Sequence, residues 1–193
     1  MGTISMIEFE LTYKSTRSVD WPRINILHND MLIGQKTCDQ NKFTFKIDAQ
    51  EKNIIKLDWV NKTQKHTITE GDKIIKDQTF ELCNVRVDGI QIENWFLTEG
   101  LYSPRYFKGY IEQYAQSRIN TPLDKVIKSQ LIWHFPGTFT FMEFDKDFWN
   151  WYFKLKQDKE VIKFLDKDPE RVHKFRGSLD PCDDLVQKIK ELI

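Results

Sequence analysis

Two runs of alternating apolar and polar residues within the stretch Asn53–Ile92 constrain the fold more than any other feature of the chain. The first run is IKLDW, residues 55–59, and the second is FELCNVRV, residues 80–87, which ends at an Asp-Gly turn. Alternation with a period of two places apolar side chains on one face of a strand and polar side chains on the other. The stretch therefore predicts two half-buried strands joined by a long polar segment.

Similar alternation recurs elsewhere in the first half of the chain. Residues 6–13, 23–26 and 43–47 each follow it, and a hairpin signal, His28-Asn29-Asp30, precedes the apolar run Met31–Ile33. Five to seven short strands separated by turn residues, without helical periodicity, are typical of an antiparallel β-sandwich of the jelly-roll or immunoglobulin type. We therefore predict a mainly β fold in which residues 1–97 form the sandwich.

After the sandwich the pattern changes, and we predict a second segment of mixed structure, residues 98–193. It is expected to begin with an extended arm rich in aromatic residues and to continue with a hairpin turned at Pro136-Gly137. Apolar residues spaced three and four apart predict a helix over 145–165, and Asp180-Pro181 precedes a short amphipathic helix. The sandwich is thus expected to carry a small α+β appendage.

The composition excludes several classes of function. Lysine plus arginine and aspartate plus glutamate number 29 each, so the formal net charge is zero and the basic surface of a nucleic-acid-binding protein is not expected. No apolar run approaches the ~20 residues that a membrane-spanning helix needs. The three cysteines form no CxxC pair, which argues against a disulfide framework or a zinc site and fits a reducing place of assembly. We therefore expect no nucleic-acid partner, no membrane partner and no cofactor.

No catalytic constellation stands out, and we predict that the protein is not an enzyme. His66 and Asp77 could form a general base and its orienting acid, but the nucleophile motif G-x-S-x-G is absent. The four histidines lack a metal-binding spacing such as HExxH. Glu143 and Asp145 are the pair considered for glycoside cleavage, which needs two carboxylates facing each other across a cleft. A glycoside hydrolase is accordingly the third of three functional hypotheses.

Asp72, Asp77 and Asp88 are candidate ligands of a cation. Two of them adjoin glycines, in Gly71-Asp72 and Asp88-Gly89, and a short acidic side chain in such a turn commonly bonds its own backbone. The interpretation as turn residues is therefore preferred, and no metal site is predicted.

Aromatic residues supply the candidate binding surfaces. Rings at consecutive positions from Phe148 to Phe153 cannot all face one helix interior, so some must cover another surface. Aromatic side chains are enriched in subunit interfaces, and the predicted partner interface consists of Tyr102, Tyr106, Phe107, Tyr110, Tyr114, Trp149 and Trp151. Tryptophan rings also form platforms on which sugars stack, and the candidates for glycan binding are Trp21, Trp59 and Trp95.

The stretch VNK…HTI…GDKIIKDQTFELCNVRVDGI, residues 60–90, resembles the closing strands of calcium-dependent xylan-binding modules. It is also similar to virion proteins of tailed bacteriophages that combine such a sandwich with a W-x-F-x-G turn and an aromatic helix. Here the corresponding residues are Trp133, Phe135, Gly137, Phe144, Phe148, Trp149 and Trp151. The resemblance implies a carbohydrate-binding-like sandwich in a virion protein that is assembled in the host cytoplasm.

The sequence departs from this resemblance at the calcium site. Asn61 stands at the first residue of the family's Asn-Asp pair, but the second is Lys62, a cation where an oxygen ligand is needed. Asp77 matches a ligand of the following segment, whereas Cys83 stands in place of a later aspartate. We therefore expect no calcium here.

These observations lead to two main hypotheses. The first is a non-enzymatic structural protein of a bacteriophage head, neck or tail, held by other virion proteins or by copies of itself through its aromatic segment. The second is a module that binds host surface polysaccharide through exposed tryptophans. The first hypothesis predicts an oligomer or complex that buries residues 102–114, and the second predicts a monomer whose tryptophan fluorescence responds to sugar.

Overall fold

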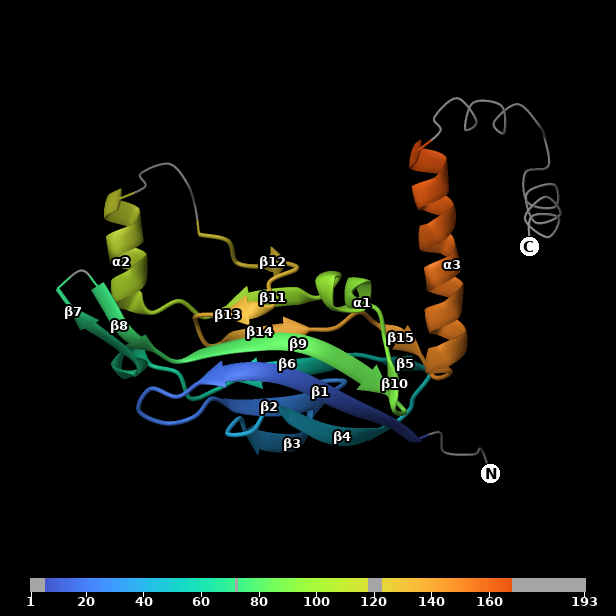
Figure 1. The fold of residues 1–193 in the computed structure, drawn as a ribbon, viewed down its shortest axis with the longest axis horizontal. Coiled ribbons are helices and arrows are strands. Elements are labelled where there is room, and N and C mark those ends of the chain that lie inside the picture. Colours follow the sequence, from blue (N-terminus) through green and yellow to red (C-terminus); the bar gives the residue numbers. More distant parts are fainter. Residues whose placement is uncertain (1–5, 72, 118–122, 168–193) are drawn as a thin grey trace, which may run out of the picture. The chain divides into compact units, whose positions relative to one another are not determined.

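The computed structural model describes residues 6–71, 73–117 and 123–167 (Figure 1). The chain divides into two compact units, Met1–Phe148 and Trp149–Ile193. No helix among the described residues is long and apolar enough to cross a membrane. The first unit holds every described strand, and its architecture follows from how those strands pair.

The first unit is built from two main antiparallel sheets and two short ribbons. The five-stranded sheet has the order β10 (Ile90–Gln91), β9 (Thr79–Val87), β1 (Met6–Thr16), β4 (Lys42–Asp48), with β13 (Ile132–Trp133) also paired to β9. The six-stranded sheet has the order β12 (Ile127–Lys128), β11 (Leu101–Pro104), β14 (Gly137–Thr140), β6 (Ile55–Trp59), β2 (Arg23–His28), β3 (Met31–Thr37). The ribbons pair β15 (Phe144–Asp145) with β5 (Lys52–Asn53), and β7 (Thr67–Glu70) with β8 (Lys73–Asp77). The helices are a 3₁₀ turn (Gln64–His66), α1 (Asn94–Thr98), α2 (Lys108–Ser117) and α3 (Phe148–Lys167).

The alternation seen in the sequence becomes the two faces of each strand. In β1, Ile7, Phe9, Leu11 and Tyr13 are buried, and the residues between them are half-buried on the opposite face. The inward faces of the two main sheets enclose the core, which is rich in aromatic rings. The predicted fold class, a mainly β antiparallel sandwich with short helices, is confirmed.

The compact units of the structure do not divide at the predicted domain boundary after residue 97. Strand β14 lies inside the six-stranded sheet, between β11 and β6, with Phe139 opposite Leu57. Strand β13 adds Trp133 to the other sheet, where it lies opposite Phe80 of β9. The inward side chains of residues 101–145 therefore complete the core begun by residues 6–97, and the compact unit runs to Phe148.

The predicted hairpin at Pro136-Gly137 is also wrong, because its two arms belong to different sheets. Strand β13 pairs with β9 of the five-stranded sheet, whereas β14 pairs with β6 and β11 of the six-stranded sheet. The dipeptide marks a crossing between the layers. Glycine is needed there because a methyl group at Gly137 would lie 2.6 Å from the carbonyl oxygen of Ser103.

The aromatic segment after residue 101 is not an extended arm. Its first part is β11, and residues from Lys108 onwards form α2. Tyr106, two residues before α2, and Tyr110, within it, stack with their ring centroids 5.7 Å apart. The four-residue spacing of Tyr110 and Tyr114 is the sequence signal that matches this helix. Tyr114 falls within α2, but its side chain lies outside the described residues.

The long aromatic helix predicted over 145–165 is present as α3. Most of it belongs to the second unit, in which the ring of Trp149 lies 5.9 Å from that of Tyr152 and 5.8 Å from that of Phe153. Neighbouring rings on one turn thus contact each other. The short helix predicted after Asp180-Pro181 lies outside the described residues.

Candidate functional site

A buried lysine is the centre of the polar segment between β6 and β9. The side chain of Lys62 is fully buried, and its ammonium donates to Asp77 Oδ1 at 2.7 Å and to the carbonyl oxygen of Gln78 at 2.6 Å. The same nitrogen lies 5.3 Å from the ring centroid of Trp59. Burial lowers the pKa of Lys62, and the hydrogen bond and charge of Asp77 act against that lowering. The lysine joins β6 to the point where β8 ends and β9 begins.

Asp20 gathers the other polar groups of this region around one carboxylate oxygen. His66 Nε2 lies 2.8 Å from Asp20 Oδ1, and the same oxygen accepts hydrogen bonds from Gln78 Nε2 at 2.9 Å and Asn61 Nδ2 at 3.0 Å. Burial raises the pKa of Asp20, but the hydrogen bonds from Asn61, His66 and Gln78 outweigh it, so the pKa is lowered overall. The suggested pairing of His66 with Asp77 is wrong, because His66 is oriented by Asp20.

Of the three aspartates considered as cation ligands, the two that the structure describes do not come together. Asp77 and Asp88 lie beyond opposite ends of β9, and Asp72 lies outside the described residues. Asp88 has the left-handed backbone conformation of a turn residue, and its Oδ1 accepts a hydrogen bond at 2.9 Å from the backbone N–H of Glu8 on the neighbouring strand β1. Calcium does not fit between Asp77 and Gln78, because the ammonium of Lys62 lies there. Among the described residues, no group of three or more acidic, histidine or cysteine side chains is arranged to hold a metal.

The carboxylates considered for glycoside cleavage share a single lysine. Glu143 and Asp145 lie 3.4 Å and 2.7 Å from the ammonium of Lys52. Both side chains are about half exposed. Two carboxylates that converge on one surface lysine are neutralised by it, and this arrangement does not form the pair of opposed acids that glycoside cleavage requires.

The tryptophans proposed as a glycan platform differ in exposure. Trp59 has no exposed surface, so its predicted role in stacking on a sugar is wrong: its ring packs in the core, and its indole N–H donates to Asn61 at 3.1 Å. Trp21, before β2, and Trp95, in α1, are half-buried. For these two residues glycan binding stays a prediction.

The residues of the predicted partner interface also differ in exposure. Tyr102 is buried and stacks on Trp133 at 5.2 Å, and its hydroxyl donates to the carbonyl oxygen of Phe135, so its assignment to an interface is wrong. Tyr106, Phe107 and Tyr110 are half-buried and surround the ring of Phe135. Trp149 and Trp151 are half-buried within α3. For Tyr106, Phe107, Tyr110, Trp149 and Trp151 a partner interface stays a prediction.

The outward face of the five-stranded sheet is covered by ion pairs between neighbouring strands. Lys46 pairs with Glu8 at 2.9 Å, and Lys42 pairs with Glu10 at 3.1 Å. Opposite charges on neighbouring strands contribute little stability when exposed, but they keep a sheet face solvated. This face has the character of an ordinary solvent-facing surface.

The outward face of the six-stranded sheet is different, because one row of polar side chains crosses five of its strands. The row, here called the polar row, consists of Gln35 (β3), Asn25 (β2), Asp58 (β6), Thr138 (β14) and Ser103 (β11). Each residue lies directly opposite the next in the strand register. Directly opposite residues project from the same face, and all five are exposed or half-buried.

Hydrogen bonds hold the polar row in place. Gln35 Nε2 donates to Asn25 Oδ1 at 2.7 Å, and the Thr138 hydroxyl donates to Asp58 Oδ1 at 2.8 Å. Arg105 donates to Asp58 Oδ1 at 2.6 Å and to the carbonyl oxygen of Trp59 at 2.5 Å. The hydrogen bonds described for the Asp58 carboxylate are both accepted by Oδ1. Sequence reasoning missed this row, because its residues come from five separate strands and form no motif.

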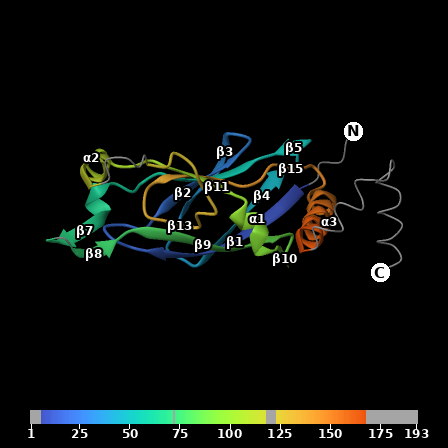
Figure 2. The ribbon, with the colours of Figure 1, turned by 90° about the horizontal axis from the view of Figure 1, so that it is seen from above.

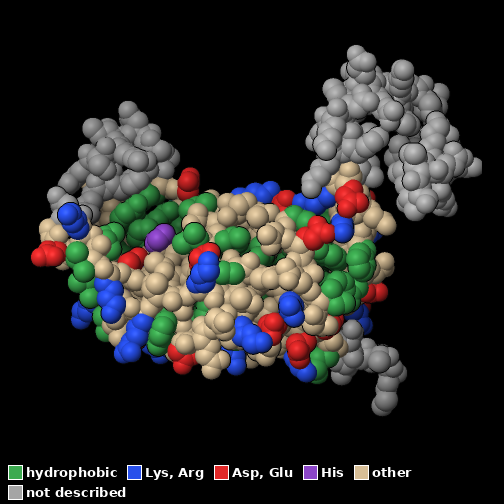
Figure 3. Space-filling view, viewed as in Figure 1, with side chains coloured by type: hydrophobic (Ala, Val, Ile, Leu, Met, Phe, Trp, Pro, Cys, Tyr) green, Lys and Arg blue, Asp and Glu red, His purple; other side chains and the backbone are tan. Residues whose placement is uncertain are grey.

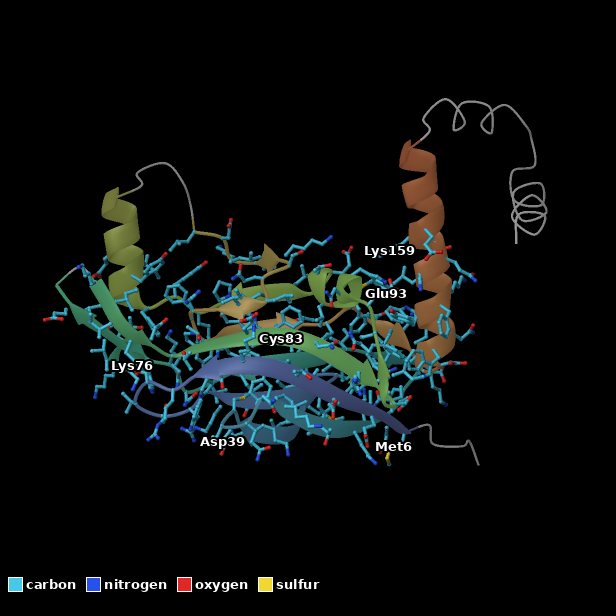
Figure 4. The ribbon with its side chains drawn as sticks, viewed as in Figure 1. Met6, Asp39, Lys76, Cys83, Glu93 and Lys159 are labelled. Atoms are coloured by element: carbon cyan, nitrogen blue, oxygen red, sulfur yellow. The ribbon has the colours of Figure 1, made fainter. Side chains whose placement is uncertain are left out.

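A polar pocket of about 410 Å³ lies at the edge where β3 leads into β4. Its lining residues are Glu10, Tyr13, Lys36, Thr37, Asp39, Gln40, Lys42, Phe43 and Thr44. Two of them, Lys36 and Thr37, directly follow Gln35 of the polar row in β3. Figure 4 labels Asp39, one of the lining residues. The volume lies within the range of small-molecule sites.

Cys38 is buried beside this pocket, and it makes folding sensitive to alkaline pH. Burial raises the pKa of its thiol from 9.0 to about 12. Between those values the unfolded chain loses the thiol proton while the folded chain keeps it. Stability is therefore full below pH 9 and falls as the pH rises toward 12, by ~1.4 kcal/mol per pH unit from this group.

Replacing Cys38 with alanine is therefore expected to flatten the alkaline part of the stability profile. The measurement is the free energy of unfolding in urea at intervals from pH 8 to about 11 for both proteins. The variant loses packing at every pH, but the difference between the two proteins should shrink as the pH rises. Parallel profiles would show that the thiol titrates alike in the folded and unfolded chain.

Comparisons with known proteins give one structural likeness. The fold is similar to that of the solved structure "vCBM60 in complex with galactobiose", a carbohydrate-binding module, with a TM-score of 0.44 and 6% sequence identity over 71% of this chain and 99% of that chain. No family model and no curated protein matched the sequence. At this TM-score and identity the likeness carries no conclusion about a site or ligand of this chain.

Proposed function

We propose that this protein is a non-enzymatic module that binds carbohydrate through the outward face of its six-stranded sheet. The observation that carries this proposal is the polar row, which presents amide, carboxylate and hydroxyl groups at five successive strands. Sugar hydroxyls both donate and accept hydrogen bonds, so they are matched by side chains of this mixed kind.

The dimensions and charge of the row support a carbohydrate ligand. Five strands spaced ~4.8 Å apart give a row about 19 Å long, enough for several sugar rings. The one acidic group, Asp58, is balanced by Arg105 at 2.6 Å. The row is therefore close to neutral, in contrast to the alternating charges on the other sheet.

We keep a structural protein of a bacteriophage virion as the second candidate, with other virion proteins or further copies of the chain as partners. The observation that favours it is the number of apolar side chains left exposed on the sandwich, among them Met31, Leu32 and Ile33 at the tip of the β2–β3 hairpin. Apolar residues grouped on a surface mark sites of protein contact. The two candidates are compatible, since a virion component can also bind a host polysaccharide.

The proposal is tested by binding of the full chain to a panel of immobilised polysaccharides. The double variant Asn25→Ala, Gln35→Ala removes two members of the row, and each lost hydrogen bond is worth ~1 kcal/mol, so affinity should fall about tenfold or more. The matched control is Thr12→Ala, Lys46→Ala on the outward face of the five-stranded sheet, which should bind like the unchanged protein. Binding that the row variant leaves unchanged would refute the assignment of the face, and the absence of binding to any polysaccharide would refute the function.

A further inference from the structure

Strand β4 is an outer strand of the five-stranded sheet, and its edge away from β1 pairs with no other described strand. All seven of its residues pair with β1, from Asp48 opposite Met6 to Lys42 opposite Thr12, without a shift of register. The polar pocket described above is lined by residues 42–44, so this part of the edge is open. An open and regular edge of this kind is a template for pairing with another strand.

The hydrogen bonds of β1 show which backbone groups of β4 are free. Successive residues of a strand inside an antiparallel sheet bond alternately to its two neighbours. On the β9 side, the carbonyl oxygen of Glu8 accepts from the N–H of Asp88 at 2.8 Å. On the β4 side, the N–H of Tyr13 donates to the carbonyl oxygen of Asn41 at 2.9 Å, so odd-numbered residues of the two strands bond to each other. The N–H and C=O groups of the even-numbered residues in 42–48 therefore point to the free edge, and within the part of the chain that the structure describes they have no hydrogen-bond partner.

The core is incompletely covered along this edge. Figure 2 shows β1 and β9 on one side of the sandwich and β2 and β3 on the other, and β4 and β3 are outer strands of these two layers. Phe45, in the middle of β4, stacks on Phe9 at 5.2 Å and lies 6.3 Å from Phe43. Both neighbours are buried, but Phe45 is only half-buried. A strand added to this edge would remove more of this apolar ring from water.

The side chains of β4 are complementary to those of a second copy in one register. When two copies run antiparallel with Phe45 on the two-fold axis, Lys42 faces Asp48 of the second copy, and opposite charges facing across two strands are favourable. With Thr44 on the axis, Lys42 would face Lys46 of the second copy, and with Lys46 on the axis two lysines would face each other. A register centred between two residues places edge-facing backbone groups opposite groups that point away, so the hydrogen bonds are lost.

The charged groups of this register are free to meet. Asp48 is exposed, and its carboxylate makes no ion pair or hydrogen bond within the described parts of the chain. The side chain of Lys42 is 59% exposed, and its partner Glu10, at 3.1 Å, has a second cation in Arg86 at 3.9 Å. Figure 3 shows side chains of both charges along the lower margin of the molecule, where Figure 1 labels β3 and β4. Lys42 can therefore bind the carboxylate of a second copy while Glu10 keeps a counter-charge.

We propose that the protein forms a symmetric dimer in which β4 pairs antiparallel with β4 of a second copy, centred on Phe45. The two five-stranded sheets then form one continuous sheet, joined by about eight backbone hydrogen bonds, and the two Phe45 rings cover each other. A two-fold interface uses the same patch on both subunits, as this pairing requires. The polar row belongs to the six-stranded sheet, so the dimer and carbohydrate binding are independent proposals.

The first test is the solution mass of the full chain by light scattering over a range of micromolar concentrations. The unchanged protein should approach the mass of a dimer as the concentration rises. Thr44→Pro should stay a monomer, because the Thr44 N–H points to the free edge, and a proline there removes the donor while an edge strand tolerates it. Circular dichroism checks that the variant is folded. An unchanged protein that is a monomer at all concentrations, or a dimer that persists in folded Thr44→Pro, would overturn the proposal.

An exchange of charges tests the register. Asp48→Lys places a lysine opposite Lys42 at both ends of the interface, so the dissociation constant of the dimer should rise about tenfold, and Lys42→Asp should have the same effect. The double variant Lys42→Asp, Asp48→Lys restores opposite charges and should recover the dimer. Asp124→Lys, the same change at an exposed aspartate between α2 and β12, is the control and should dimerise normally. Single variants that dimerise like the control, or a double variant no better than the single ones, would refute pairing centred on Phe45.

Discussion

Replacing Lys62 with methionine is expected to lower the free energy of unfolding by ~3–5 kcal/mol. The lysine side chain is fully buried, and Asp77, with only 16% of its side chain exposed, loses its counter-charge when the ammonium is removed. Methionine restores much of the volume but neither hydrogen bond, so the carboxylate and the carbonyl oxygen of Gln78 are left without their donor. The loss of stability arises because an unpaired carboxylate and an unpaired carbonyl oxygen remain in the core.

The measurement is urea unfolding followed by tryptophan fluorescence, with Lys14→Met as the control. The Lys14 side chain is 74% exposed and pairs with Glu81 at 3.3 Å, so its loss should change stability by less than ~1 kcal/mol. The double variant Lys62→Met, Asp77→Asn removes the orphaned charge and should recover part of the loss. If the single variant is as stable as the control, the buried pair does not hold β8 and β9 to β6.

Local sequence pattern was enough to predict the sandwich but not its extent. The strands of residues 6–16 and 79–87 are long enough for alternation to show, and both are present. The strands β13 and β14 have two and four residues, too few for a period to be read. Their place in the sheets depends on pairing with β9 and β6, which is fixed by tertiary contacts that no local pattern records.

The candidate site, too, could be predicted from the sequence only in part. Asn61, Lys62, His66 and Asp77 all belong to the polar segment that the sequence predicts between two strands, and the structure joins them in one network because this segment folds back on itself between β6 and β9. The sequence pattern could not identify Asp20, which lies before β2 and accepts three of the hydrogen bonds. Long-range partners of this kind require the fold to be known first.

The tryptophans show why composition is a weak guide to a binding face. A tryptophan in a strand can face inward or outward, and a shift of one residue in the pattern reverses the choice. Trp59 shares the inward face with Ile55 and Leu57 and is buried, whereas its neighbour Asp58 points outward into the polar row. The binding groups proposed here are thus the polar residues that alternate with the core residues.

Replacing Trp133 with alanine is expected to destabilise the protein by ~3–5 kcal/mol, as for other large aromatic residues removed from a core. Trp133 has no exposed surface and belongs to the five-stranded sheet through β13. Its ring stacks on Tyr102 at 5.2 Å and contacts Phe139 at 5.6 Å, and both of those residues belong to the six-stranded sheet. One side chain therefore joins the two layers.

The matched control is Ile132→Ala, at the preceding residue of the same strand. Ile132 is 45% exposed on the outward side, so its truncation should lower the free energy of unfolding by less than ~1 kcal/mol. Both variants are compared in urea by far-ultraviolet circular dichroism, a readout that does not depend on the lost indole. A large loss for Trp133→Ala in a single transition means that residues 6–97 and the strands of residues 101–145 unfold together. A small loss, or two separate transitions, would mean that the sandwich holds without its later strands, and the boundary at residue 97 would stand after all.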